Sequence, residues 1–472
     1  MSEVCAGWLL AVVGLGCCSA AVWAGEAEGP LPLPKDAARL KGDCVVMVVG
    51  SSVSVRRYGV HPLPKWTGGS NRVPPQCTNG QNVFFRVFEM LNDHGNMCWR
   101  RLPDADWRRS AGKALMELPI RGGTKTVEVA DWAPYSRLPW RAASPRVSYL
   151  AGRAGAWAEV TVPAGYEKLE LIYTSDPQGD KIKVTVDGKV PATNALVDTR
   201  QETSVPAAAK LGEVFTVLDS HGKPRRIRPP KRGIGNIVEL RARYELDPKG
   251  PHVFRIERAS DDPRKRILVW GVVYWRGHCV QVVQRAKGGL NCGALPEYSA
   301  IQEVVALKPD YVLMEAINIR GKPSGVTRSL DAGYAWCAAQ KGRFKTLVYS
   351  TCQASSRRFR AWFRVPAHKP PYGAKDYEQT CADAHCEACQ GAVVALCRKY
   401  GFPLVDVGAR VDAYMAEHPT VRFVPHILND WYHPNQWGAA LFGVTIGEGI
   451  KAHWPELPVR PIRMPPAPAP GK

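Results

Sequence analysis

The chain has 472 residues, of which 45% are hydrophobic and 22% are charged, an ordinary balance for a globular protein. This length exceeds what one hydrophobic core usually holds, so two domains are expected. The formal charge of +20 raises the question of a nucleic-acid partner, but the sequence shows no zinc-finger or RNA-recognition motif, and we predict no nucleic-acid binding. The charge is instead typical of a basic exported protein that meets acidic polymers or surfaces.

Residues 1–24 have the pattern of an export signal. An apolar stretch leads to Val22-Trp23-Ala24, which fits a small-residue cleavage site. Cys17 or Cys18 could instead carry the lipid of a lipoprotein signal, so a lipid anchor remains an alternative. Later in the sequence we find no apolar run of the roughly 18 residues that a spanning helix needs, and we predict no transmembrane segment. A secreted, periplasmic or cell-surface protein is expected.

The first buried strand is predicted at Cys44–Val49, after a lead-in segment of residues 25–41. Its continuous apolar, β-branched run is typical of a strand buried on both faces, as in a parallel sheet. The run ends in Gly50-Ser51-Ser52, and α/β sheets place their active sites at the carboxyl ends of such strands. An amphipathic helix is predicted at Asn82–Leu91. Residues 42–94 are therefore expected to be the first part of an α/β domain.

Residues 95–277 show strand patterns in place of helical ones. The Asp187-Gly188 pair is a strong hairpin signal. The spacing predicts an antiparallel, jelly-roll-like β-sandwich inserted into the α/β domain. Six runs carry the alternating pattern: Trp157–Val162, Leu169–Thr174, Ile182–Val186, Ile237–Tyr244, His252–Glu257 and Ile267–Trp275.

Residues 278–457 return to alternating strands and helices. With the first strand they predict a five-stranded parallel sheet between helices, a three-layer α/β/α sandwich. The Pro-rich tail, residues 458–472, is expected to be disordered. The expected strands are Cys279–Gln284, Asp310–Glu315, Lys345–Ser350 and Leu404–Val407, and the expected helices are Pro296–Leu307, Leu330–Gln340, Tyr377–Tyr400, Val411–Glu417 and Gln436–Trp454.

The cysteines number 14, and three of them lie in the signal, which leaves 11. An odd number means at least one free thiol or a bond between chains, and the spacing does not assign the pairing. One predicted helix carries Cys381, His385, Cys386, Cys389 and Cys397. A metal site there is one interpretation. Core packing or disulfide bonding is the favoured one, and we predict no metal.

The segment Asp430-Trp431-Tyr432-His433-Pro434 places a carboxylate three residues before a histidine. A histidine beside a carboxylate is the base half of a nucleophilic hydrolase, provided that a serine or cysteine can reach it. Ser52 and Asn318 each follow the carboxyl end of a predicted parallel strand. Parallel strands bring these ends to one edge, so the three segments are expected to meet although they lie far apart in sequence.

At these residues the chain resembles the SGNH/GDSL hydrolase superfamily, over about residues 42–92 and 279–455. The most specific match is the pattern Asp-x-x-His-Pro-Asn-x-x-Gly at residues 430–438, and the run Lys308–Val312 leading into Asn318 is similar to the family's strand before its asparagine block. The resemblance implies a flavodoxin-like α/β/α fold and neither a metal nor an organic cofactor.

The first and third family blocks are altered in this chain. Ser51 stands where the family usually has the Asp of Gly-Asp-Ser, and Ala316 and Ile319 replace the first and last residues of the usual Gly-x-Asn-Asp. The residues to which the resemblance gives chemical roles are retained. Because the residues around them are altered, an inactive relative is kept as an alternative.

The resemblance implies a nucleophile at Ser52, a general base at His433 and an orienting carboxylate at Asp430. A hydroxyl needs a base to remove its proton during attack, and a neutral imidazole can do this near pH 7. Ser54 is a rival nucleophile by proximity. The oxyanion is expected to bind the Ser52 backbone N–H and the Asn318 amide.

A third oxyanion donor is expected in the loop after the second strand. Gly293 is preferred to Gly289 because its distance from Lys308 suits the family better. Trp431, Tyr432 and Trp437 could line a sugar-binding cleft, and at least one of them is expected in the core instead.

The expected function is a secreted serine esterase that removes acetyl or other small acyl groups from a carbohydrate or polysaccharide. The warrant for carbohydrate is the export signal, the inserted sandwich and the many tryptophans. One alternative is a lipase-like esterase or O-acyltransferase of the same fold, and another is a catalytically inactive glycan-binding protein. The sequence specifies neither the sugar, nor the acyl group, nor the oligomeric state.

Overall fold

A computed structural model of the chain provides the structure. All described residues belong to one compact unit, Leu33–Lys472. The structure describes residues 40–50, 83–92, 96–102, 106–120, 123–134, 149–175, 179–200, 215–218, 224–227, 238–286, 307–316, 323–350, 383–419, 421, 434 and 436–462.

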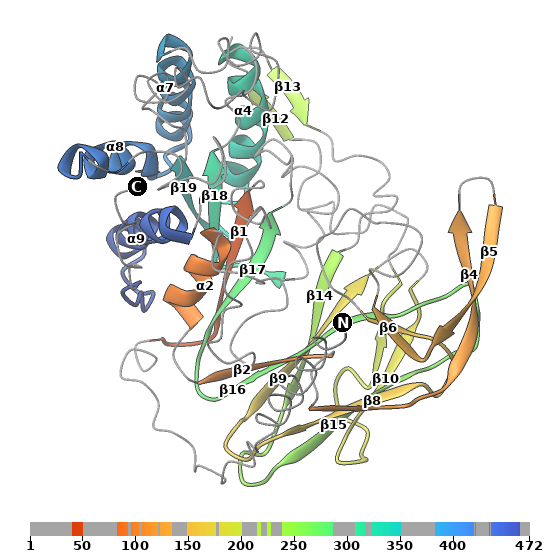
Figure 1. Ribbon diagram of the computed structural model, residues 1–472. Helices are drawn as coiled ribbons and strands as arrows, with labels where there is room; N and C mark the ends of the chain where they lie inside the picture. Colours follow the sequence, from red (N-terminus) through yellow and green to blue (C-terminus); the bar gives the residue numbers. More distant parts are fainter. Residues whose placement is uncertain are drawn as a thin grey trace, which may run out of the picture. The chain divides into compact units, whose positions relative to one another are not determined.

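Five parallel strands form one sheet, in the order β17-β1-β18-β19-β20 (Figure 1). Numbered by their order in the chain, these strands read 2-1-3-4-5, which is the flavodoxin-like doubly wound order. The predicted parallel sheet is confirmed, and no strand end differs from its predicted position by more than two residues. The bounds are β1 Cys44–Gly50, β17 Val280–Ala286, β18 Tyr311–Ala316, β19 Lys345–Ser350 and β20 Leu404–Asp406.

Helices pack against both faces of this sheet. Val46 and Val48 of β1 share a buried cluster with helices α2 (Val83–Asn92), α8 (Val407–Glu417) and α9 (Gln436–His453). Met47 and Val49 share another cluster with helices α4 (Pro323–Ala339) and α7 (Asp383–Tyr400). Successive side chains of a strand point to opposite faces, so each face of β1 has its own helical cover.

Two helices begin earlier than the sequence pattern predicts. Helix α4 begins at Pro323, seven residues before Leu330, because proline suits a first helical turn whose N–H groups have no partner within the helix. Helix α8 begins at Val407 rather than Val411. The Asp406 carboxylate accepts a hydrogen bond from the backbone N–H of Ala409 at 2.9 Å, and this cap fixes the start of α8.

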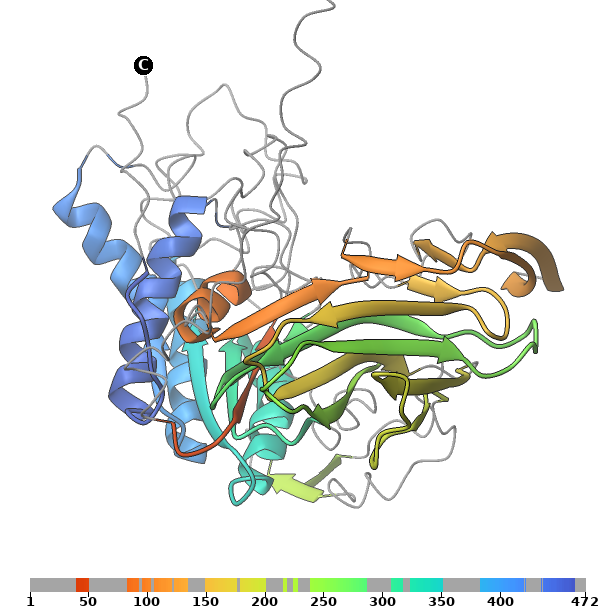
Figure 2. The same ribbon diagram turned by 90° about the horizontal axis from the view of Figure 1, so that it is seen from below.

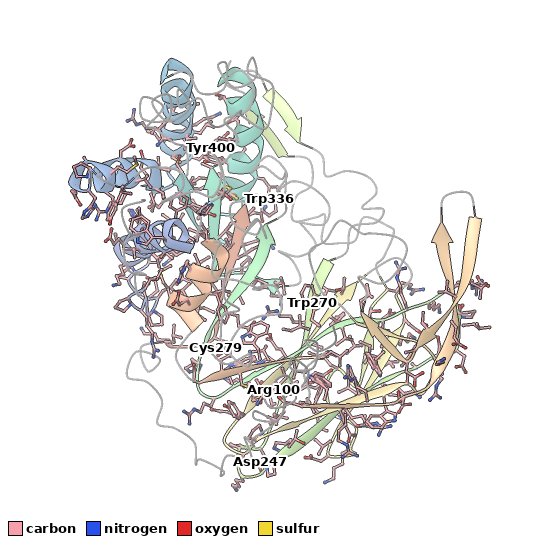
Figure 3. The ribbon with its side chains drawn as sticks, viewed as in Figure 1. Arg100, Asp247, Trp270, Cys279, Trp336 and Tyr400 are labelled. Carbon is pink, nitrogen blue, oxygen red and sulfur yellow. The ribbon has the colours of Figure 1, made fainter. Side chains whose placement is uncertain are left out.

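Helices α4 and α7 are joined by polar contacts to one buried carboxylate, that of Asp331. Tyr400, the last residue of α7 and labelled in Figure 3, donates a hydrogen bond from its hydroxyl to the Asp331 carboxylate of α4 at 2.6 Å. Lys399 forms an ion pair with the same carboxylate at 2.9 Å. The predicted helix Pro296–Leu307 lies outside the described residues except for its last position.

The strands between Met97 and Trp275 form antiparallel sheets. One has the order β11-β10-β15-β8-β3, a second has the order β14-β9-β16-β7-β6 with β2 paired to β16, and β4–β5 and β12–β13 form separate two-stranded sheets. Figure 2 shows the long strands of the two larger sheets running beside one another. Their bounds are β2 Met97–Arg101, β3 Trp107–Arg109, β4 Lys113–Ile120, β5 Gly123–Ala130, β6 Trp132–Pro134, β7 Tyr149–Ala151, β8 Trp157–Val162, β9 Lys168–Ser175, β10 Lys181–Val186, β11 Leu196–Asp198, β12 Phe215–Leu218, β13 Pro224–Ile227, β14 Val238–Glu245, β15 His252–Arg258 and β16 Leu268–Trp275.

The two larger antiparallel sheets contribute to one buried cluster. Val160 and Phe254 come from the first sheet, and Leu171 and Tyr274 come from the second. All six strands predicted in this region are present, as β8, β9, β10, β14, β15 and β16. The limits of the insert and its description as a jelly-roll sandwich remain predictions.

The six-stranded antiparallel sheet also shares a core with the α/β part of the chain. Trp99 of β2 and Trp270 and Trp275 of β16 belong to the same buried cluster as helix α2 and the first strand. The ring of Trp99 meets that of Phe88 in α2 edge to face, with centroids 6.2 Å apart. The antiparallel strands are therefore packed against the helix that follows β1, and not only linked to it by the chain.

Candidate active site

The carboxyl ends of three parallel strands lie together at one edge of the sheet. In the register of β1, Gly50 pairs with Ala286 of β17 and Val49 pairs with Met314 of β18. The three strands therefore end within about one residue of each other. Ligand sites of open α/β sheets lie at this edge, close to the strand where the order reverses, which here is β1.

Helix α9 has its carboxyl end at the opposite, amino edge of the sheet. Trp454 follows its last residue and packs on Tyr311, the first residue of β18, with ring centroids 4.9 Å apart. Tyr311 also donates a hydrogen bond from its hydroxyl to the Glu456 carboxylate at 2.7 Å. A helix of 18 residues spans about 27 Å, and a strand of six spans about 20 Å. The amino end of α9 therefore lies toward the carboxyl edge.

Contacts between α9 and α2 support this direction. A Cβ atom at Gly443 would lie 2.6 Å from Cβ of Arg86, and one at Gly447 would lie 2.5 Å from Sδ of Met90. Moving from Gly443 to Gly447 along α9 corresponds to moving from Arg86 to Met90 along α2, so the two helices run in the same direction. Helix α2 follows β1 and returns from the carboxyl edge, and the glycines of α9 allow the two backbones to approach closely.

The predicted site residues lie outside the described residues, apart from Trp437. Ser52 comes two residues after the end of β1, Asn318 two after the end of β18, and His433 three before the start of α9. The structure thus places the ends to which these segments are attached, while the distances among the predicted catalytic groups stay predictions. The other predicted site residues outside the described ones are Gly293, Asp430, Trp431 and Tyr432.

Trp437 lies in the first turn of α9 and belongs to the core. Its side chain is 6% exposed, and its ring centroid is 4.8 Å from that of Tyr414 in α8. At least one of the three aromatic residues was expected in the core, and Trp437 is such a residue. Its burial fixes the first turn of the helix that directly follows the predicted base.

Two polar features at the carboxyl edge were missed by the sequence analysis. Glu315 is fully buried at the end of β18, three residues before Asn318, and a charged residue in an apolar strand could have signalled it. Ser350 at the end of β19 donates a hydrogen bond to the Gln390 side-chain oxygen, and the Gln390 amide donates to Asp406, each at 2.7 Å. Sequence patterns carry no signal for this second chain of contacts.

The described residues hold no group of three or more His, Cys, Asp or Glu side chains placed to bind a metal. Of the predicted helix cluster, Cys397 is the member whose side chain is described; it is buried in the core, where burial raises the pKa of its thiol to about 12. A protonated, buried thiol packs as a small apolar side chain. Separately, no helix in the described part of the chain is both long and apolar enough to cross a membrane.

Comparison with protein-family models gives no match, and comparison with curated proteins gives none either. Solved structures do match. The protein YxiM of Bacillus subtilis is 10% identical over 75% of this chain and 93% of its own, with a TM-score of 0.31. A family two carbohydrate esterase from Cellvibrio japonicus is 8% identical over 76% of this chain and 99% of its own, with a TM-score of 0.26. A GDSL-like lipase from Parabacteroides merdae is 14% identical over 36% of this chain and 72% of its own, with a TM-score of 0.27.

Because each of these TM-scores is below 0.5, the function proposed below rests on the residues and topology of this chain. The chain combines a parallel sheet in 2-1-3-4-5 order with the Asp430–His433 motif directly before its last helix.

Proposed function

We propose that the chain is an exported serine esterase of the SGNH type that removes acetyl or other small acyl groups from a carbohydrate. The observation that carries the proposal is the convergence of three chain ends at one sheet edge: those of β1 and β18 and the amino end of α9. Each is two or three residues from a predicted catalytic group. The proposal includes a three-layer α/β/α arrangement and a β-sandwich at residues 95–277.

The reaction proceeds through an acyl-enzyme. Ser52 Oγ attacks the ester carbonyl while His433 takes its proton, and Asp430 holds the imidazole in the required tautomer and stabilises the imidazolium. His433 then gives the proton to the leaving sugar oxygen. Water, activated by the same imidazole, releases the acid and restores the Ser52 hydroxyl.

Three hydrogen-bond donors stabilise the negative oxygen of each tetrahedral intermediate. They are the backbone N–H of Ser52, the backbone N–H of Gly293 and the side-chain amide of Asn318. One such donor typically lowers the barrier by about 3–4 kcal/mol. The adjacency of β17, β1 and β18 supports this set, because each donor follows a different one of these strands.

The pH dependence of ester hydrolysis provides the first test. His433 must be neutral to act as the base, so kcat/KM should rise as the pH passes an ordinary histidine pKa of about 6.5 and then level off. The measurement is the initial rate of nitrophenyl acetate hydrolysis between pH 5 and 8. A flat profile over this range would exclude histidine as the base.

Substrate comparison separates the proposed esterase from its alternatives. Short-chain esters should be hydrolysed faster than long-chain ones, and acetylated polysaccharide should release acetate. A preference for long acyl chains would favour a lipase-like esterase, and acyl transfer to an added sugar would favour an O-acyltransferase. Polysaccharide binding without turnover of any ester would identify an inactive glycan-binding protein.

A further inference from the structure

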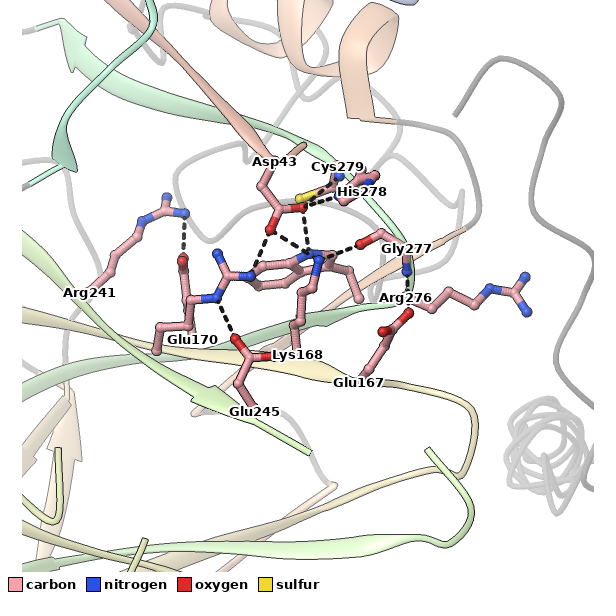
Figure 4. Close-up of polar contacts among 12 residues, drawn as sticks. Asp43, Glu167, Lys168, Glu170, Arg241, Glu245, Arg276, Gly277, His278 and Cys279 are labelled. Atoms are coloured by element: carbon pink, nitrogen blue, oxygen red, sulfur yellow. Dashed lines mark hydrogen bonds and ion pairs between the residues drawn. The ribbon is translucent and has the colours of Figure 1, made fainter. Parts of the chain in front are cut away.

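The amino edge of the parallel sheet has a junction where basic side chains are neutralised. Asp43, directly before β1, accepts a hydrogen bond from Arg243 of β14 at 2.7 Å and forms an ion pair with Lys168 of β9 at 3.3 Å (Figure 4). The backbone N–H of Cys279 and the Trp275 indole also donate to it, at 3.0 and 3.2 Å. Burial raises the pKa of Asp43, but these donors outweigh it, and the pKa lies below its ordinary value.

A second set of basic residues lies on the loops that enter β1, β18 and β19. These three strands are neighbours in the sheet, and neighbouring strands are about 4.8 Å apart. All five side chains of the set are exposed, and we call the set the basic edge. Its members are Lys41, three residues before β1, Lys308, three before β18, Lys341 and Arg343 between α4 and β19, and Lys345, the first residue of β19.

Backbone hydrogen bonds hold the starts of these strands side by side. The N–H of Asp310 donates to the carbonyl of Val45 at 2.9 Å, and the N–H of Lys345 donates to the carbonyl of Asp310 at 2.9 Å. The Asp310 carboxylate also accepts a hydrogen bond from the N–H of Val45 at 2.8 Å. The loops that carry the basic edge are therefore held together by the sheet itself.

The positive charge of the basic edge is largely uncompensated. Among the residues that the structure describes, Lys345 is its only member with an acidic partner, which is Glu456. Asp310 is a second exposed carboxylate at this edge. The carboxylate of Asp43 is occupied by the cations of the junction. Five cations thus face two available carboxylates.

Three exposed cations of the antiparallel sheets have different surroundings. Their side chains are 57% to 80% exposed, yet each has a carboxylate within 4.0 Å. The pairs are Arg108 with Glu159, Lys183 with Glu257 and Arg200 with Asp198. Exposure alone therefore does not leave a cation without a counter-charge in this chain, and the unpaired charge at the basic edge is a local property.

The chemistry of the basic edge suits a polyanion better than a small anion. An exposed ammonium is a point charge on a flexible stem, and one exposed ion pair contributes little binding energy. A polymer can contact several such cations at once, because each contact after the first forms within the same complex. The formal charge of +20 adds long-range attraction for a polyanion at low salt.

The basic edge and the predicted catalytic groups lie at opposite ends of the strands. Ser52 and Asn318 follow the carboxyl ends of β1 and β18, whereas Lys41 and Lys308 precede their amino ends. A strand of six residues spans about 20 Å. A polymer bound at the basic edge therefore leaves the candidate active site open to a substrate.

We propose that the basic edge binds an acidic polysaccharide, a polymer that carries carboxylate or sulfate groups, and thereby holds the protein on a carbohydrate matrix. The binding of a polyanion does not depend on the esterase reaction. The choice of a polysaccharide as the polyanion rests on the proposed carbohydrate function.

The first test is calorimetry of the full chain with polygalacturonate, dextran sulfate and neutral dextran at low ionic strength. At least one anionic polymer should bind, dextran should not, and the affinity should fall as salt rises, because salt screens exposed charges. The two anionic polymers show whether carboxylate or sulfate is recognised. Absence of binding to both, or equal binding to dextran, would overturn the inference.

A triple variant tests the place of binding. Lys308→Asn/Lys341→Gln/Arg343→Gln removes three cations of the basic edge, and asparagine is chosen because Lys308 has a φ of 43°, which asparagine tolerates. Each exposed ion pair contributes little, so the loss of three should weaken binding by about tenfold. Thermal unfolding shows whether the variant is folded.

The matched control removes the same charge elsewhere. Arg108→Gln/Lys183→Gln/Arg200→Gln changes side chains that are 80%, 57% and 63% exposed on the antiparallel sheets. This control should keep most of the affinity. Equal losses in the two triple variants would show that net charge alone attracts the polymer, and the basic edge would not be the binding surface.

Hydrolysis of nitrophenyl acetate in the presence of the polymer tests the separation from the active site. Saturating non-acylated polymer should leave kcat and KM unchanged. Competitive inhibition would place the polymer at the carboxyl edge and contradict the inference. Tighter binding to double-stranded DNA or to phosphatidylglycerol vesicles than to either polysaccharide, at equal salt, would contradict the polysaccharide assignment.

The binding measurements also separate this inference from the proposed reaction. If no ester is hydrolysed but an anionic polymer binds and the basic-edge variant loses this binding, the esterase proposal fails and the binding surface stands. If esters are hydrolysed but neither anionic polymer binds, the binding surface fails and the esterase stands.

Discussion

Replacing Ser52 with alanine should lower kcat for acyl esters by about a million-fold, the scale seen when a serine nucleophile is removed. The reason is chemical: without Oγ no acyl-enzyme can form, and only slow attack by water at the oxyanion site remains. Ser52 follows β1 by two residues, at the edge where β17 and β18 also end. The measurement is turnover of nitrophenyl acetate, with thermal unfolding to show that the variant is folded.

The matched control is Ser54→Ala, which removes a hydroxyl two residues further along. Its kcat should stay close to that of the wild type, because Ser54 is given no chemical role. If Ser54→Ala abolished turnover and Ser52→Ala did not, the nucleophile would be Ser54. If neither change reduced turnover, the triad assignment would be wrong.

The second large effect is on stability. Arg258 of β15 has a fully buried side chain and pairs with Asp180 at 3.0 Å. Its guanidinium also donates to the backbone carbonyls of Gly152, Asp262 and Lys265, at 2.6 to 2.8 Å. Changing Asp180 to alanine leaves this cation buried without its counter-charge. Such a loss costs about 3–5 kcal/mol of unfolding free energy.

The measurement for Asp180→Ala is the shift in the urea or thermal unfolding midpoint. Glu128→Ala is the matched control. Glu128 pairs with Lys113, and the two side chains are 59% and 67% exposed. An exposed pair contributes about 0–1 kcal/mol, so the control should unfold close to the wild type. Similar midpoints for the two variants would contradict the buried-pair account.

Ionisation of the Asp180 carboxyl group makes the free energy of unfolding depend on pH. Burial favours the neutral form of Asp180, but hydrogen bonds from Ser260, the Lys181 backbone and Arg258 outweigh it, and the pKa lies below its ordinary value of 3.8. A depressed pKa stabilises the fold above the ordinary value, and this contribution is lost as pH falls through the folded-state pKa. The stability difference between wild type and Asp180→Ala should therefore narrow in acid.

Local patterns in the sequence specified the parallel sheet and most of its helices. A strand such as β1 is a continuous β-branched run, and that pattern depends on no distant residue. The start of α4 was missed because Pro323 and its neighbours lack apolar periodicity and form a helix through their position in the fold. The strands β3 and β11, of three residues each, were missed because neither shows an alternating apolar pattern long enough to recognise.

Contacts between distant residues could not be predicted in this way. Asp43 and Arg243 are 200 residues apart, and Asp180 and Arg258 are 78 apart, yet each pair is a principal tie of the fold. Nothing in either neighbourhood identifies the partner. The candidate site could be predicted from the sequence for a different reason. Family motifs mark Ser52, Asn318 and Asp430–His433 directly, and parallel topology brings their strand ends together.

The most direct test of the esterase proposal is covalent labelling of the nucleophile. A fluorophosphonate ester should modify the native protein once, and peptide mass spectrometry should place the phosphonyl group on Ser52, with loss of esterase activity in step with labelling. Denatured protein should not react. Absence of labelling in a protein that hydrolyses esters, or a label on a residue other than Ser52, would contradict the serine mechanism proposed for this chain.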